Sequence, residues 1–253
     1  MQNPRLYPQY GILAKTGRCY ASGDLAIQSL TRKGGLRECI IPSPEHKFLI
    51  VDYVTLELVM FAQALITQFG YESKLADMIN EGSDVHRKIA ALMFQKNEED
   101  ITGEQRKCAK VLNFGIPGGL GAKRLVKNAK EFQLNWTEAK AKQMKEKWLD
   151  LFPEVRRFLS NPAQPSQGVW TLTGRFRATS IFTELRNTIF QGLGADGMNL
   201  ALKRLWENGY QIAAAIHDEV LIEIPQTAYP LSHDPFCFRI IKGVAVILGR
   251  FLP

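Results

Sequence analysis

Two regions of apolar, β-forming residues, far apart in the chain, constrain the fold most. One covers residues 48–53, and a second pair covers residues 211–216 and 220–224, separated only by His217, Asp218 and Glu219. Two such runs joined by so short a polar link are typical of a β-hairpin. The sequence between the two regions is mostly helical in pattern. The predicted fold class is therefore α+β, with a small antiparallel sheet built from both ends of the chain and a mostly helical insertion.

Local signals set the boundaries of several elements in the insertion. Ser83 and Asp84 can cap a helix that runs to about residue 94. Thr102 and Gln105 have the spacing of a capping box, so a helix should begin near residue 103 and continue until Pro117 ends it. Further predicted helices cover residues 56–69, 138–151 and 181–208, and residues 169–172 are a predicted strand.

The positive charge of the chain is concentrated in one segment. There are 32 Lys and Arg against 25 Asp and Glu, and residues 106–147 alone hold eleven basic and three acidic residues, a net of +8. Such a segment indicates a polyanionic partner, such as nucleic acid or nucleotide phosphates, or else a solvated helical face. A hydrophobic content of 45% excludes an intrinsically disordered chain.

Cysteine spacing and hydropathy indicate the cellular compartment of the protein. The four cysteines are widely spaced and form no zinc-binding pattern, so reduced thiols are expected. The N-terminus has no apolar core of a signal peptide. Charged residues interrupt the apolar run at 236–252, which favours a terminal helix over a membrane span. We expect a cytoplasmic protein with no membrane partner.

Arg106, Lys110 and Phe114 are spaced four residues apart on the predicted helix that begins near residue 103. At 3.6 residues per turn, this spacing places two cations and an aromatic ring on one face. Such a face suits a nucleotide, with the cations on its phosphates and the ring against its sugar or base. The alternative is a surface cation pair with a core phenylalanine.

Asp52 ends the first β run, and Asp218 lies in the turn of the predicted hairpin, next to Glu219. Two carboxylates held by separate strands suit a pair of Mg²⁺ ions ~3.5–4 Å apart, the arrangement used for in-line displacement at phosphorus. The alternative is that each acid caps a turn. Whether the two acids meet is not decided by the sequence.

Seven segments, in order, resemble the motifs of family A DNA polymerases, the bacterial polymerase I type. Motifs A, B and C are matched by Asp52-Tyr53-x-x-x-Glu57-Leu58, Arg106-x-x-x-Lys110-x-x-Asn113-Phe114-Gly115 and His217-Asp218-Glu219-Val220. Four further motifs of the family are matched by Thr16-Gly17-Arg18, Asp84-Val85-His86, Thr171-Leu172-x-Gly174-Arg175 and Asn187-x-x-x-Gln191-Gly192-x-x-Ala195-Asp196. The resemblance extends from about residue 11 to residue 225.

The resemblance implies a domain layout and an activity. Residues 1–62 and 169–253 would form the palm, with its antiparallel sheet, and residues 63–168 the inserted fingers. The implied function is DNA-templated DNA polymerase activity in replication or repair: addition of deoxynucleotides to a primer 3′-hydroxyl by two-metal-ion phosphoryl transfer, with release of pyrophosphate. Two Mg²⁺ ions are the implied cofactors. Primer-template DNA and deoxynucleoside triphosphates are the implied partners.

The resemblance also implies roles for individual residues. Asp52, Asp218 and the backbone of Tyr53 would hold the metal ions, with Glu219 as a less essential catalytic carboxylate and Lys110 as a candidate proton donor. The nucleotide would contact Tyr53, Glu57, His86, Arg106, Lys110 and Phe114, and Glu57 would exclude a ribose 2′-hydroxyl. The DNA would contact Arg18, Gln28, Arg32, Asn187, Gln191 and His217.

Two departures from the family pattern lead to further expectations. Gly118 stands where the family has Tyr, which implies a roomier templating pocket and poorer base selection. Only about fifteen residues precede Thr16, so the match corresponds to palm and fingers without a thumb or an exonuclease domain, and low processivity is expected. The alternatives are half of a split polymerase that needs a partner thumb or processivity protein, a template-independent nucleotidyltransferase, and a noncatalytic DNA-binding subunit.

Overall fold

The computed structural model describes residues 7–11, 14–23, 26–31, 34–82, 84–161 and 168–228. The chain divides into two compact units. The first, here called the sheet unit, contains the described residues up to Leu56 and from Gly194 onward. The second, the helical unit, contains Glu57–Leu193. This mixed architecture confirms the predicted α+β class.

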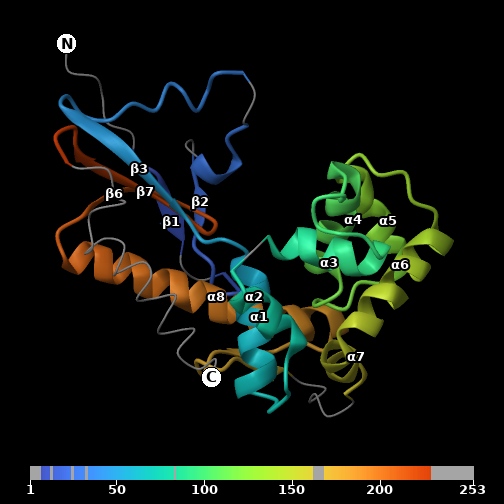
Figure 1. Ribbon diagram of the computed structural model, residues 1–253. Helices are drawn as coiled ribbons and strands as arrows, with labels where there is room; N and C mark the ends of the chain where they lie inside the picture. The colour runs from blue at the N-terminus through green and yellow to red at the C-terminus, as the bar shows by residue number, and fades with distance from the viewer. Residues whose placement is uncertain are drawn as a thin grey trace. The chain divides into compact units, whose positions relative to one another are not determined.

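A three-stranded antiparallel sheet forms the centre of the sheet unit (Figure 1). Its order is β3 (His46–Asp52), β7 (Glu219–Pro225) and β6 (Gln211–Ile216). The central strand β7 pairs with β3 over its whole length, from His46 opposite Pro225 to Asp52 opposite Glu219. The predicted meeting of the two chain ends in one antiparallel sheet is therefore confirmed.

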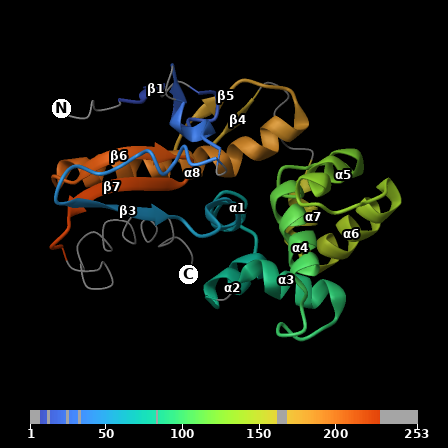
Figure 2. The same ribbon diagram turned by 90° about the horizontal axis from the view of Figure 1, so that it is seen from above.

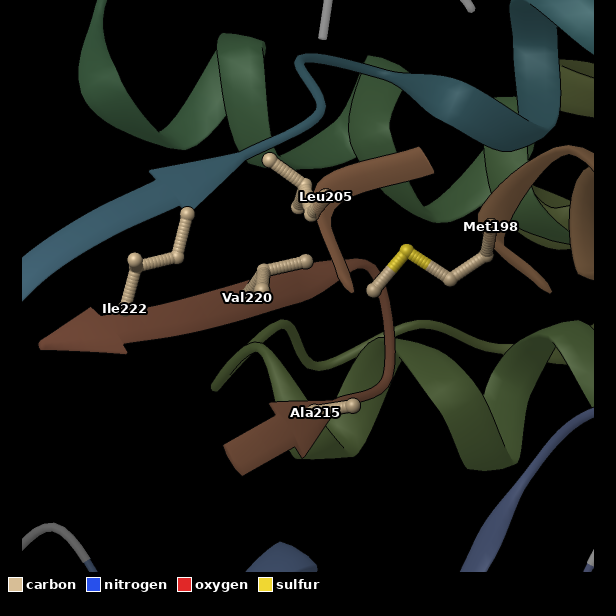
Figure 3. Close-up of a cluster of buried hydrophobic side chains, with 5 residues drawn as sticks. All are labelled: Met198, Leu205, Ala215, Val220 and Ile222. Carbon is tan, nitrogen blue, oxygen red and sulfur yellow. The ribbon is translucent and has the colours of Figure 1, made fainter. Parts of the chain in front are cut away.

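The sheet is stable because β7 is apolar on both faces. Val220 and Ile222 point to one face, where they pack with Ala215 of β6 and with Met198 and Leu205 of α8 (Phe182–Glu207), as Figure 3 shows. Leu221 points to the other face and packs with Ala214 and with Ile27 of the short 3₁₀ helix η1 (Ile27–Ser29). Each such buried aliphatic side chain contributes about 1.5–3 kcal/mol. The alternation follows the two-residue period of a strand.

Side chains from the N-terminal part of the sheet unit satisfy the backbone at the outer edge of β6. A small hairpin of β1 (Gln9–Gly11) and β2 (Tyr20–Ser22) lies in this part. The Tyr10 hydroxyl donates to the carbonyl of Ala215 at 3.1 Å and accepts from its N–H at 2.9 Å. Nε2 of Gln28 also donates to the Ala215 carbonyl, at 3.3 Å. Because an edge strand exposes unpaired backbone groups, these contacts protect it from pairing with another chain.

The helical unit contains most of the helices described (Figure 2). They are α1 (Leu56–Thr67), α2 (Lys74–Asn80), α3 (Val85–Phe94), α4 (Gly103–Gly115), α5 (Ala122–Glu131), α6 (Glu138–Leu151) and α7 (Pro153–Ser160), with the first half of α8 and a hairpin of β4 (Val169–Trp170) and β5 (Phe176–Arg177). The predictions for α1, α3, α4, α6 and α8 are confirmed to within two residues. The predicted strand at 169–172 is shorter than expected. The predicted terminal helix at 236–252 and the capping residue Ser83 lie outside the described residues.

The caps of α3 and α4 are formed as the sequence predicts. Asp84 accepts hydrogen bonds from the N–H groups of His86 and Arg87. The hydroxyl of Thr102 accepts from the N–H of Gln105, and the Gln105 side chain accepts from the N–H of Thr102, which completes the capping box. The helix then ends at Gly115, two residues before Pro117.

Gly119, in the turn after α4, provides a test of this local geometry. Its φ is +77°, and a Cβ there would lie 2.5 Å from Cε1 of the Phe182 ring. We expect Gly119→Ala to lower the free energy of unfolding by about 1–3 kcal/mol. The control is Gly103→Ala, because a Cβ at Gly103 would meet nothing within 4 Å. Urea denaturation measures both, and equal midpoints for the two variants would contradict the prediction.

Two predictions about the chain's environment concern cysteines and membranes. Cys19, Cys39 and Cys108 have free thiols, and Cys237 lies outside the described residues. None of the helices in the described ranges has both the length and the apolar character needed to cross a bilayer. The expected cytoplasmic location stays a prediction.

Candidate active site

Asp52 and Asp218 lie at the same end of the sheet in the sheet unit. Asp52 is the last residue of β3 and is opposite Glu219, while Asp218 directly precedes Glu219 in the turn. The backbone N–H of Tyr53 donates to the carbonyl oxygen of Asp218 at 3.2 Å, which ties the strand end to the turn. Asp52 is exposed, and Asp218 is half-buried. The two acids that the sequence suggested as a pair thus belong to adjoining backbone segments.

The turn itself is tighter than the sequence suggested. Ile216 pairs with Glu219, so only His217 and Asp218 lie between the strands. His217 is exposed and has a φ of 59°, in the left-handed region. Because Glu219 belongs to β7, it stands directly across from Asp52. Like charges in this position destabilise a sheet, and a bound cation would offset their repulsion.

The candidate metal ligands at this end of the sheet are carboxylate oxygens. Magnesium prefers oxygen ligands and is usually held by one or two carboxylates, with water and substrate phosphates completing its shell. The described part of the chain contains no group of three or more His, Cys, Asp and Glu side chains that could hold a metal ion. The carboxylate oxygens of Asp52 and Asp218 are donors of the type that magnesium binds.

Arg106, Lys110 and Phe114 share one side of α4 in the helical unit. The Lys110 ammonium lies 5.7 Å from the centroid of the Phe114 ring, whose side chain is 40% exposed. The His86 ring, from α3, lies 5.7 Å from the same ring. The structure thus brings two cations, an imidazole and an exposed phenyl ring together. We call these four residues the cationic face.

Asp84 connects the cap of α3 to this face. Nε of Arg106 donates to Oδ2 of Asp84 at 2.6 Å. Burial alone would raise the pKa of Asp84, but hydrogen bonds from Arg106 and from the Arg87 backbone outweigh it and hold the pKa below its ordinary value. A charged Asp84 therefore fixes the position of the Arg106 guanidinium. Sequence reasoning identified only the capping role.

His86 is the buried member of the cationic face and is neutral at physiological pH. Burial lowers its pKa to about 4, and the positive charges of Arg106 and Lys110 act in the same direction against the opposing effect of Asp84. Its Nδ1 lies 2.7 Å from Nδ2 of Asn113, and Oδ1 of Asn113 accepts from the Trp148 indole at 2.7 Å. Sequence reasoning missed the roles of Asn113 and Trp148. The available signal was a polar Asn113 among the buried positions of α4.

Glu57 and Gln191 contact each other within the helical unit. Nε2 of Gln191, on α8, donates to Oε1 of Glu57, at the start of α1, at 3.4 Å. The sequence analysis gave these residues separate roles, with Glu57 at the sugar and Gln191 at the DNA. Their contact means that Gln191 can orient the Glu57 carboxylate.

The position of Gly118 is packed against a polar side chain. A Cβ on Gly118 would lie 2.2 Å from Oδ1 of Asn187. Gly118 is buried, so a larger residue there must displace the Asn187 amide. The space that the sequence analysis expected beside Gly118 is thus filled, at least in part, by Asn187.

The remaining residues predicted to contact DNA differ in their surroundings. Arg18 is exposed. Both polar atoms of the Gln28 side-chain amide bond to backbone: Oε1 accepts from the Ala21 N–H, and Nε2 donates to the carbonyls of Cys19 and Ala215. These bonds give Gln28 a structural function, and its contact with DNA stays a prediction. Arg32 lies outside the described residues.

Comparisons with known proteins identify the family of the chain. The sequence profile of DNA polymerase family A matches residues 2–234. DNA polymerase I of Aquifex aeolicus is 29% identical over 238 residues, which cover 88% of this chain and 40% of the relative. DNA polymerase I of Geobacillus stearothermophilus is 29% identical over 213 residues, which cover 76% of this chain and 23% of the relative.

A solved structure supports the same assignment at the level of the fold. The POL domain of Pol1 from M. smegmatis, in a complex with DNA primer-template and dNTP, superposes with a TM-score of 0.76 at 19% identity. The match covers 98% of this chain and 45% of that one. The chain therefore has the fold of a polymerase domain. It belongs to DNA polymerase family A and spans less than half the length of these relatives.

Proposed function

We propose that this chain adds deoxynucleotides to the 3′-hydroxyl of a DNA primer, directed by a template strand, and releases pyrophosphate. The observation that supports this most is the position of Asp52 and Asp218 at the same end of the sheet, where the Tyr53 N–H bonds to the Asp218 carbonyl. Membership of DNA polymerase family A supports the choice of reaction.

The carboxylates of Asp52 and Asp218, with the Tyr53 backbone, are the proposed ligands of two Mg²⁺ ions, and Glu219 adds a further negative charge. When bound, the ions would activate the primer hydroxyl and neutralise charge on the triphosphate. The protein contributes the geometry, because the pairing of β3 with β7 fixes the backbone of Asp52 and the Tyr53 to Asp218 bond fixes that of Asp218 before any substrate arrives. Such preorganisation avoids reorganisation during the reaction.

The cationic face is the proposed binding site for the nucleotide. Arg106 and Lys110 would bind the β- and γ-phosphates, where charge accumulates as pyrophosphate leaves, and Lys110 would also donate the proton. Phe114 has an exposed ring that would lie against the deoxyribose. The buried His86 would donate a hydrogen bond to the triphosphate.

The proposed DNA contacts are Arg18, Gln28, Arg32, Asn187, Gln191 and His217, assisted by the basic surface of the helical unit. Most of the basic residues between 106 and 147 are exposed, on α4, α5 and α6. Exposed cations contact phosphates without reading sequence, so DNA affinity should fall steeply with salt. Low processivity is a further part of the proposal.

Glu57 is proposed to exclude ribonucleotides. Gln191 holds its carboxylate in place. Because the alanine side chain no longer excludes a ribose 2′-hydroxyl, we expect Glu57→Ala to raise the efficiency of ribonucleotide incorporation, relative to the deoxynucleotide, by roughly 10- to 100-fold. Single-nucleotide insertion with matched ribo- and deoxynucleotides measures the ratio. Glu99→Ala, at an exposed position outside the seven motifs, is the control. An unchanged ratio in Glu57→Ala would contradict the role of Glu57.

Primer extension by the purified chain tests the proposed function. A labelled primer on a longer template should be extended in the presence of Mg²⁺ and dNTPs, and EDTA should stop the reaction. Extension of the same primer without a template would instead identify a template-independent nucleotidyltransferase. DNA binding without extension, with or without added partner proteins, would identify a noncatalytic subunit.

A further inference from the structure

Three buried polar side chains form a continuous hydrogen-bonded relay, which begins at His86 of the cationic face. Trp148 of α6, Asn113 of α4 and His86 of α3 are 0%, 1% and 5% exposed. The Trp148 indole donates to Oδ1 of Asn113 at 2.7 Å, and Nδ2 of Asn113 lies 2.7 Å from Nδ1 of His86. Neither Asn113 nor Trp148 is among the residues proposed to touch the nucleotide.

The chemistry of these groups allows one protonation pattern. An indole N–H can only donate, so the atom of Asn113 that faces Trp148 must be its carbonyl oxygen. The other end of the amide is then the NH₂ group, which can only donate. Nδ1 of His86 must therefore be the unprotonated acceptor. A neutral imidazole in this state carries its proton on Nε2 and can offer that N–H to a ligand.

We propose that Asn113 and Trp148 are positioning residues that hold His86 as the neutral Nε2–H tautomer, so that the ring donates one hydrogen bond to the phosphates of a bound nucleotide. This inference rests on the proposed nucleotide-binding function of the cationic face. Asn113 and Trp148 act only through His86.

The charges around His86 explain why a neutral donor suits this position. Arg106 and Lys110 of α4 already supply two positive charges, while Asp84 at the start of α3 supplies one negative charge that is paired with Arg106. A third cation in a buried place would be costly because of desolvation and repulsion. A neutral N–H still gives a directional bond to a phosphate oxygen, and it does so equally across the physiological pH range.

Nitrogen NMR of the histidine rings tests the tautomer directly, without any substrate. The chain has four histidines, and His86→Gln identifies the His86 signals by their loss. We expect the wild type to show protonated Nε2 and unprotonated Nδ1 at His86 from pH 6 to pH 8. A protonated Nδ1, either as the other neutral tautomer or as imidazolium, would overturn the proposal.

Asn113→Asp is the variant expected to reverse the direction of the hydrogen bond between position 113 and His86. Its carboxylate has almost the same shape but can only accept, so one oxygen takes the Trp148 N–H and the other requires a proton on Nδ1 of His86. We expect the His86 signal to change to protonated Nδ1.

Trp148→Phe removes the indole donor and allows the Asn113 amide to rotate by 180°, so a mixture of His86 tautomers is expected. Asn135→Asp, at an exposed position, is the control and should leave His86 unchanged. An unchanged His86 tautomer in both relay variants would overturn the positioning role.

Equilibrium binding of dATP with Mg²⁺ links the tautomer to the ligand. Loss of one hydrogen bond to a charged phosphate should weaken binding about tenfold in Asn113→Asp. Equal affinity in wild type and variant would overturn the contact between His86 and the phosphates. If the NMR results are as expected but the wild type binds no dATP, the relay exists and the proposed nucleotide-binding function is what fails. If binding is intact but the tautomer differs, the relay proposal alone fails.

Discussion

Replacing Asp218 with Asn, or Asp52 with Asn, is expected to reduce the rate of primer extension by roughly 10³-fold or more. The substitution keeps the shape of the side chain but removes a negative charge from the end of the sheet where the metal ions are proposed to bind. Metal ions in such sites stabilise the transition state by several kcal/mol, and each 1.36 kcal/mol corresponds to a factor of ten in rate. A loss of this size identifies residues that act in the chemical step.

The stability of Asp52→Asn should not fall. Asp52 is exposed, and its carboxylate faces Glu219 across the strand pair, so removing one like charge relieves repulsion. Thermal unfolding should therefore give equal or slightly higher midpoints for Asp52→Asn. Asp77→Asn, at an exposed position on α2, is the matched control and should retain the wild-type rate. Undiminished extension by both active-site variants would refute the metal assignment.

The second large effect is expected at Lys110. Its ammonium lies between the rings of Phe114 and Phe132, 5.7 and 5.8 Å from their centroids, so its position is restricted before a nucleotide binds. We expect Lys110→Ala to lower the single-turnover rate of nucleotide incorporation by about 10³-fold, because a cation that stabilises the departing phosphates contributes on this scale.

Two further variants make the Lys110 prediction specific. Lys107→Ala removes an exposed lysine from the same helix and should change the rate little, since Lys107 is not part of the cationic face. Arg106→Ala should mainly weaken nucleotide binding and also free Asp84 from its ion pair. If Lys110→Ala and Lys107→Ala lose activity equally, general positive charge on α4 would account for the effect, and a specific role for Lys110 would be wrong.

The elements that the sequence predicted well are those whose signals are local. The capping box at Thr102 and Gln105 sets the start of α4, and the Lys-rich pattern after Thr137 sets the whole of α6. Helix α2 was missed because it is short. Helix α5 was missed because its basic residues conceal the few apolar positions, Leu125 and Ala129, that it buries.

Helix α7 was missed for a different reason. Pro153 comes shortly after the predicted helix at 138–151 and disfavours its continuation, yet proline is also well suited to the first position of a new helix. In the structure it does both, since α6 ends at Leu151 and α7 begins at Pro153. The ambiguity is intrinsic to proline, and the sequence around it does not resolve it.

In the site, too, local features could be predicted from the sequence and tertiary contacts could not. The spacing of Arg106, Lys110 and Phe114 was enough to predict a shared helical face. The register that places Asp52 opposite Glu219 could not be predicted, because it depends on how two distant strands align. Likewise, the contact of Trp148 with Asn113 joins two helices through the core and leaves no periodic pattern in the sequence.

Templated incorporation tests the central claim most directly. The purified chain would be given Mg²⁺, one labelled primer annealed to four templates that differ only in the first unpaired base, and each dNTP separately. The account predicts that the complementary nucleotide is incorporated preferentially on every template, and that Asp218→Asn abolishes all incorporation. The account would be contradicted by incorporation of the same nucleotide regardless of the template, or by template-directed incorporation that persists in Asp218→Asn.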